Sequence, residues 1–102
     1  MIDLIHSNRR ALTELCDRSG ARRLDVFGSA ARGDFDPARS DLDFIVEFDA
    51  LPPAQYAKAY FELKEGLESL FERPVDLVTV PALINPYYKQ RVTSESCNVY
   101  AR

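Results

Sequence analysis

Two short stretches of the sequence carry side chains that suit phosphate and metal chemistry. Gly28 and Ser29 form a small-residue turn directly after an apolar run. A glycine lets the backbone approach a phosphate, and a serine at a helical start adds a hydroxyl and an N–H. Asp41 and Asp43 stand at the head of the next apolar run, and carboxylates hold Mg²⁺ that also binds substrate phosphates. The two stretches together predict a site for Mg²⁺ and a nucleoside triphosphate.

Hydrophobic periodicity predicts the elements that must position these groups. The pattern of apolar residues predicts an α/β (α+β) protein, with a small mixed sheet of three main strands flanked by helices in the order α-β-β-α-β-α. The predicted elements are a helix over 3–18, a strand over 24–27, a brief helical turn from 29, a strand over 41–48, a helix over 54–71, a strand over 75–80, a helix over 82–92 and a short final strand over 98–100.

The predicted order of elements brings a third carboxylate, Asp76, toward the first two. A helical crossover between two strands makes them parallel, so Asp43 and Asp76, each near the start of its strand, should meet at one edge of the sheet. Asp41 and Asp43 alternate by two and should share a face. If the first strand runs antiparallel to the second, Gly28 at its end also arrives at that edge.

This convergence suits a phosphoryl-transfer site with two metal ions. Asp41 and Asp43 would bind metal, while Asp76 would complete the second metal site and help to deprotonate an acceptor hydroxyl. Arg32 and Arg39 flank the site and would neutralise phosphate charge. Taken singly, each feature has a plainer interpretation as a common turn, a solvated strand face or a surface arginine. Their joint order favours the site.

Composition bounds the other possibilities. The 102 residues, 46% of them hydrophobic, predict one domain over 1–102, and the net charge of −3 does not favour broad nucleic-acid binding. No apolar run is long enough to span a membrane, and the first residues lack the layout of a signal peptide. Cys16 and Cys97 show no metal-binding spacing, and Cys16 is expected to be a buried free thiol. We therefore expect a cytoplasmic protein.

At three motifs the chain resembles the minimal nucleotidyltransferases (MNT proteins) of the DNA polymerase β superfamily. The motifs are Phe27-Gly28-Ser29-Ala30-Ala31-Arg32-Gly33, Ser40-Asp41-Leu42-Asp43 and Arg73-Pro74-Val75-Asp76-Leu77-Val78. The resemblance extends over nearly the whole chain and is specific as a set. It implies the polymerase β-like fold and transfer of a nucleoside monophosphate, AMP from ATP, to an acceptor hydroxyl with release of pyrophosphate.

By the same resemblance, Gly28 and Ser29 would hold the triphosphate, Asp41 and Asp43 would bind Mg²⁺, and Asp76 would be the third carboxylate. Many minimal members are antitoxins that adenylylate a tyrosine of a partner HEPN-domain RNase toxin. A chain of this size leaves no second domain for an acceptor, so a partner protein or a second copy of the chain would supply part of that site.

Three alternatives to this enzyme remain open at the level of sequence. The same fold could act as an inactive binding module that neutralises its partner by occlusion. It could transfer the nucleotide to a small acceptor such as an aminoglycoside, although such enzymes generally carry extra helical segments. It could also be a plain structural subunit.

Overall fold

The computed structural model describes residues 3–28, 41–79 and 96–101. These residues form three helices and four strands: α1 (Asp3–Ser7), α2 (Arg9–Ser19), β1 (Ala21–Phe27), β2 (Leu42–Phe48), α4 (Pro53–Phe71), β3 (Val75–Thr79) and β4 (Cys97–Ala101). The mixed α/β fold class is confirmed. The helix predicted over 82–92 and the turn predicted from 29 lie outside the described residues.

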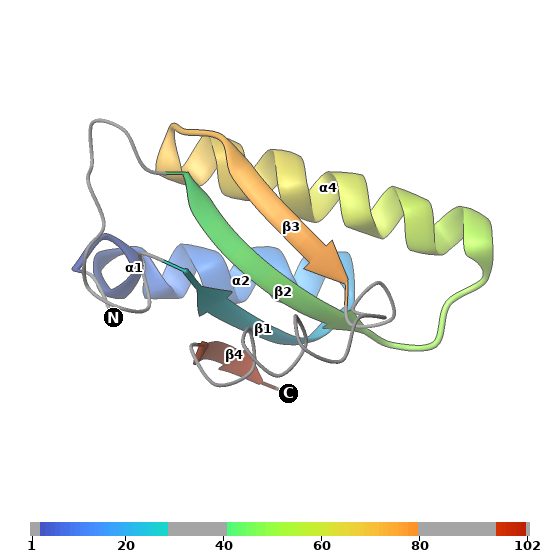
Figure 1. The fold of residues 1–102 in the computed structure, drawn as a ribbon. Helices are drawn as coiled ribbons and strands as arrows, with labels where there is room; N and C mark the ends of the chain where they lie inside the picture. The colour runs from blue at the N-terminus through green and yellow to red at the C-terminus, as the bar shows by residue number, and fades with distance from the viewer. Residues whose placement is uncertain (1–2, 29–40, 80–95, 102) are drawn as a thin grey trace.

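The four strands form one mixed sheet in the order β3-β2-β1-β4, drawn side by side in Figure 1. β1 runs antiparallel to both β2 and β4, whereas β2 and β3 are parallel. The parallel pair is joined by α4, as expected for a helical crossover. The short final strand adds a fourth member to the three main strands, and it extends one residue beyond each end of the predicted range.

The helix predicted over 3–18 is two helices that separate at Asn8. The backbone of Asn8 leaves the helical region with φ −106° and ψ 16°, and its N–H donates to the Ile5 carbonyl at 3.2 Å. Its side-chain amide donates to the Leu4 carbonyl at 2.8 Å. An asparagine side chain that bonds nearby backbone competes with helix continuation, which explains the break. α2 then ends at Gly20 in the left-handed conformation (φ 79°), which favours glycine.

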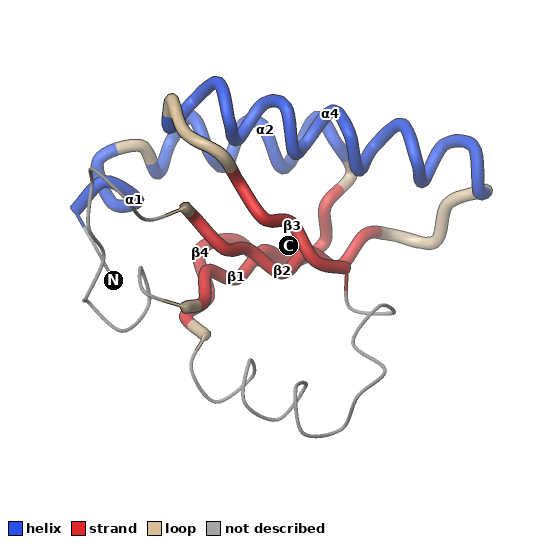
Figure 2. Tube along the Cα trace, turned by 45° about the horizontal axis from the view of Figure 1, so that its top comes forward, coloured by secondary structure: helices blue, strands red, loops and turns tan. Residues whose placement is uncertain are grey.

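Helices α2 and α4 cover one face of the sheet, seen as a blue layer above the red strands in Figure 2. Leu24, Phe44 and Val46 point into this layer and are fully buried against helix residues such as Leu12 and Leu63. The alternating pattern of β2 thus has the predicted outcome, because residues two apart on a strand share a face. None of the described helices is long and apolar enough to cross a membrane.

The two covering helices approach closely at Gly66 of α4. A Cβ atom at that position would lie 2.5 Å from Leu15 Cδ1 of α2. A glycine inside a helix costs about 1 kcal/mol relative to alanine, and the close contact with Leu15 explains why it is present. Cys16, on the same helix as Leu15, is buried and free, as predicted.

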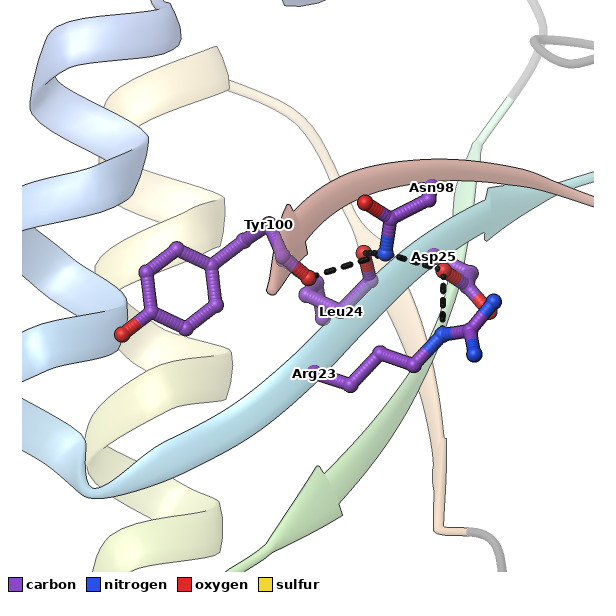
Figure 3. Close-up of polar contacts among 5 residues, drawn as sticks. All are labelled: Arg23, Leu24, Asp25, Asn98 and Tyr100. Atoms are coloured by element: carbon purple, nitrogen blue, oxygen red, sulfur yellow. Dashed lines mark hydrogen bonds and ion pairs between the residues drawn. The ribbon is translucent and has the colours of Figure 1, made fainter. Parts of the chain in front are cut away.

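β4 joins the sheet through an irregular register. Leu24 pairs with Tyr100, yet the next residue, Asp25, pairs with Asn98, so one extra residue, Val99, is accommodated in β4. This bulge sends Tyr100 toward α2, where its hydroxyl donates to the Asp17 carboxylate at 2.5 Å. It sends Asn98 to the opposite face, where the amide donates to Asp25 Oδ1 at 2.9 Å and to the Tyr100 carbonyl at 2.9 Å (Figure 3).

Candidate nucleotidyl-transfer site

The face of the sheet opposite the helices carries the predicted acidic groups. On β2 the residues of this face are Asp43, Ile45 and Glu47, which alternate with the core residues of the helix face. Phe27 of β1 and Ile45 form a small second apolar cluster with Val78 of β3. Ile45 is therefore buried as well, although it lies between Asp43 and Glu47 on this face. Ile45 and Val78 of this cluster lie two residues beyond Asp43 and Asp76 along their strands, and Phe27 lies beside Asp43.

Gly28 and Asp43 are in direct contact. Gly28 follows β1 with φ +69°, a backbone conformation that non-glycine residues rarely adopt. A Cβ atom at this position would lie 2.5 Å from Asp43 Oδ2 and 3.4 Å from Asp43 Cγ. The carboxylate of Asp43 therefore rests against the main chain at the start of the Gly28-Ser29 turn. Glycine is required at this position for two reasons, the positive φ angle and the close approach of the Asp43 carboxylate.

Asp43 is aligned with residues of both neighbouring strands. It pairs with Phe27 across the antiparallel ladder and with Asp76 across the parallel ladder. Aligned residues of neighbouring strands lie on the same face, and the strands are about 4.8 Å apart. The expectation that Asp43 and Asp76 meet at one edge, together with the end of β1, is confirmed by these registers.

Two hydrogen bonds from α4 fix the strand that carries Asp76. Glu68 Oε2 accepts from the Val75 N–H at 3.2 Å, and the Tyr60 hydroxyl donates to the Leu77 carbonyl at 2.7 Å. These bonds hold the residues on both sides of Asp76, while the Asp76 side chain itself is exposed to solvent. The backbone on both sides of Asp76 is therefore held by the helix on the other face of the sheet.

Asp41 lies just outside the strand that the sequence predicted to begin with it. β2 begins at Leu42, whose N–H donates to the Pro74 carbonyl at 3.3 Å, and the β2–β3 ladder starts with Leu42 and Val75. Asp41 is exposed. Within the described ranges, no three Asp, Glu, His or Cys side chains are grouped closely enough to hold a metal ion. The structure thus aligns Asp43 with Asp76 and leaves Asp41 at the approach to the strand.

The remaining predicted site residues, Ser29, Arg32 and Arg39, lie outside the described residues.

A further carboxylate on the same face as Asp43 was not singled out from the sequence. Asp25 accepts hydrogen bonds from Asn98 at 2.9 Å and from Arg23 Nε at 3.2 Å (Figure 3). Asp25 stands two residues before Phe27, and this spacing is the sequence signal that places both residues on one face of the strand.

The donor set of Asp43 and Asp76 fits a hard divalent cation. Both supply carboxylate oxygens, which Mg²⁺ prefers. Like charges aligned across a ladder are unfavourable, so a cation between them would relieve their repulsion. The contact of Asp43 with Gly28 brings the same carboxylate to a turn that can approach a phosphate.

Comparison with known proteins agrees with this geometry. A family model for the nucleotidyltransferase domain matches residues 9–97. The protein adenylyltransferase MntA of Thermococcus cleftensis is 40% identical over 70 residues, which are 69% of this chain and 67% of the relative.

Two solved structures share the fold. One, a "putative minimal nucleotidyltransferase", is 35% identical with a TM-score of 0.73 and covers 93% of this chain and 92% of its own. The other is the complex of the tri-AMPylated HEPN toxin of Shewanella oneidensis with its MNT antitoxin. The matched chain of that complex is 21% identical to this chain, with a TM-score of 0.64. The match covers 96% of this chain and 73% of the matched one. With the family model matching most of its length, this chain belongs to the nucleotidyltransferase domain family, and its fold is that of the minimal nucleotidyltransferases.

Proposed function

We propose that this chain is a Mg²⁺-dependent protein adenylyltransferase that transfers AMP from ATP to a hydroxyl of a HEPN-domain toxin and thereby neutralises it as its antitoxin. The observation that carries the proposal is the alignment of Asp43 with Asp76 on adjacent strands, with the Asp43 carboxylate against Gly28 at the end of β1. The relative from Thermococcus is named a protein adenylyltransferase, and the MNT antitoxin of similar fold was solved with an AMPylated HEPN toxin.

In the proposed reaction the acceptor oxygen attacks the α-phosphorus of ATP. The bond from that phosphorus to the bridging oxygen breaks, pyrophosphate leaves, and the acceptor becomes an AMP ester. Gly28 and Ser29 hold the triphosphate, and Arg32 and Arg39 offset its charge. Asp76, exposed beside Asp43, takes the proton of the acceptor hydroxyl.

Asp41, Asp43 and Asp76 would hold the metal in this proposal. When bound, Mg²⁺ would stabilise the charge that develops on the phosphoryl and leaving oxygens. Asp41 stands two residues before Asp43 and is exposed, so its carboxylate is accessible to a cation that arrives with the nucleotide. Metal and nucleotide together would complete the ligand set, because Mg²⁺ in such sites takes part of its ligands from substrate phosphates.

The test is label transfer from α-labelled ATP to a purified HEPN-domain partner in the presence of Mg²⁺. We expect label on the partner with the unaltered chain, and none with the double variant Asp41→Ala/Asp43→Ala. Toxin neutralisation should be lost in the same variant. Transfer that survives removal of both carboxylates would disprove the assignment.

The same double variant separates catalysis from occlusion. If it neutralises the toxin as strongly as the unaltered chain, the chain acts by binding its partner and the enzymatic proposal fails. A folded state of the variant, checked by its circular dichroism, makes either outcome decisive. Glu47→Gln, on the same strand and face as Asp43, is the matched control and should leave transfer unchanged.

A further inference from the structure

Two side chains of α4 reach the outer edge of β3. This strand is an end strand of the sheet in the part of the chain that the structure describes, and α4 runs along it in Figure 1. The Tyr60 hydroxyl donates to the Leu77 carbonyl at 2.7 Å, and Glu68 Oε2 accepts from the Val75 N–H at 3.2 Å. Both bonds go to the backbone of the strand that carries Asp76.

The two bonds use backbone groups that do not pair with β2. The Leu42 N–H donates to the Pro74 carbonyl at 3.3 Å, so the Pro74 carbonyl faces β2. The backbone groups of successive strand residues point to alternate sides, so those of Asp76 face β2 as well, and those of Val75 and Leu77 face away. Strand β3 is therefore held on one side by the ladder to β2 and on the other side by α4.

The start of the ladder between β2 and β3 carries a charge repulsion that these bonds oppose. Asp43 and Asp76 are partners in that ladder, one residue beyond its first pair, Leu42 and Val75. Like charges opposite each other destabilise strand pairing, and β3 has only five residues with which to compensate. The bonds from α4 hold the residues on both sides of Asp76, which is the point where this repulsion acts.

We propose that Tyr60 and Glu68 are positioning residues for adenylyl transfer, which act through β3 to keep the Asp76 carboxylate aligned with Asp43. This inference rests on the proposed function. Both residues belong to α4, which covers the face of the sheet opposite Asp76, so they do not touch the reacting groups. A displacement of about 1 Å in a catalytic group lowers the rate about 10²-fold. Loss of one of the two bonds should therefore cost less than that.

Tyr60→Phe tests the first bond, because it removes the hydroxyl and keeps the ring. We expect kcat for transfer of labelled AMP to the HEPN-domain partner to fall about 10-fold. KM for ATP should change by less than about 2-fold, because the turn at Gly28, which is proposed to hold the triphosphate, follows β1 and is not altered. A fall in kcat without a change in KM separates a positioning role from a general loss of binding.

Tyr56→Phe is the matched control for this variant. It removes the same hydroxyl one turn earlier on α4, where the ring packs edge-on against Phe48 with centroids 5.2 Å apart. It should leave kcat unchanged. Equal loss of kcat in the Tyr56→Phe and Tyr60→Phe variants would overturn the proposal.

Glu68→Gln and Glu68→Leu test the second bond as a pair. Glutamine keeps a side-chain oxygen that can accept from the Val75 N–H, whereas leucine has no acceptor. Glu68→Leu should lower kcat about 10-fold, and Glu68→Gln should retain most of it. Equal loss in both variants would show that the charge of Glu68 matters and the bond does not, which would overturn its assignment.

Amide hydrogen exchange provides a readout that does not depend on activity. In Tyr60→Phe the Asp76 N–H should exchange about 10-fold faster than in the unaltered chain, because exchange reports local opening. The amides of the ladder between β1 and β2 should keep their rates, and Tyr56→Phe should exchange as the unaltered chain does. The same rate at Asp76 in both tyrosine variants would overturn the proposal.

Failure of the positioning proposal and failure of the proposed function give different results. Absence of label transfer by the unaltered chain would show that the proposed function is wrong, and the exchange rates would then still decide whether α4 holds β3. Label transfer that Tyr60→Phe and Glu68→Leu leave unchanged would show that the positioning proposal alone is wrong.

Discussion

The two faces of the sheet differ in how they use their side chains. The helix-covered face holds Leu24, Val26 and Phe44, all 0% exposed, packed against α2 and α4. The opposite face aligns Asp43 with Asp76 and brings Asp43 against Gly28. Alternation along a strand sends neighbouring residues to opposite faces, so one strand can serve stability and chemistry separately. Substitutions on the two faces should therefore affect different properties.

Asp43→Asn should produce the largest difference between the effect on adenylyl transfer and the effect on stability. We expect adenylyl transfer to fall by about 10³-fold, since removal of a group that stabilises developing charge has an effect of that order. The free energy of unfolding should change little or rise, because one of two aligned like charges is removed. Transfer to the HEPN partner and urea unfolding measure the two effects. Loss of folding in this variant would contradict the separation of the faces.

Phe44→Ala should have the opposite profile, although Phe44 is the next residue along the same strand. Phe44 is fully buried and stacks on Phe71 with ring centroids 6.1 Å apart. We expect the free energy of unfolding to fall by about 3–5 kcal/mol, measured by urea denaturation. Phe61→Ala is the control: Phe61 is 57% exposed, and its loss should change stability by about 0.5 kcal/mol or less. Equal effects of the two variants would show that the helix face is not the core.

A pair of glycines sharpens the comparison, since both adopt positive φ but only one contacts the acidic face. Gly28→Ala introduces a Cβ atom 2.5 Å from Asp43 Oδ2, whereas a Cβ atom at Gly20 would meet nothing within 4 Å. Both variants should lose about 1–2 kcal/mol of stability through backbone strain. Only Gly28→Ala should also lose transfer, by about 10²-fold, because a displacement of about 1 Å in a catalytic group has an effect of that size.

Stability is the control measurement for the two glycine variants. Thermal unfolding should shift similarly for Gly20→Ala and Gly28→Ala, while the rate of label transfer separates them. Equal rates of transfer in the two variants would mean that the contact between Gly28 and Asp43 has no part in the chemistry.

Much of this contrast could be predicted from the sequence, because it depends on local periodicity. The alternation of Leu42, Phe44 and Val46 identifies the buried face of β2, and the intervening helix requires β3 to be parallel. These two facts bring Asp43 and Asp76 to the same edge of the sheet, and the structure adds the register that aligns them. The position of Gly28 at the same edge follows once β1 is taken as antiparallel, and the structure confirms that direction.

Other features depend on contacts between distant residues, which periodicity does not encode. Gly66 looks unfavourable in a helix until Leu15, from another helix, is found against it. The bulge at Val99 sends Asn98 and Tyr100 to opposite faces of the sheet, and Asn98 then bonds to Asp25 of β1. The break at Asn8 likewise follows from one side-chain hydrogen bond.

The smallest effect at neutral pH is expected at Cys16, on the helix face. Burial, with a lesser effect of the Asp17 charge, raises the pKa of its thiol from 9.0 to about 12. Above pH 9 the unfolded chain releases this proton while the native chain retains it, so the native state binds more protons and stability falls as pH rises. Below pH 9 both states are protonated and this residue adds no pH dependence.

The measurement is urea unfolding at pH 7, 9 and 10.5, with Cys16→Ala as the reference. We expect the unaltered chain to lose stability above pH 9 by up to about 1.4 kcal/mol per pH unit relative to that variant. Iodoacetamide at pH 8 should modify Cys97, which is half-buried, well before Cys16. The same pH slope in both proteins, or rapid modification of native Cys16, would show that the helix-covered face admits water. The conclusion that the helix-covered face excludes water and serves stability, whereas the opposite face is accessible and reactive, would then be wrong.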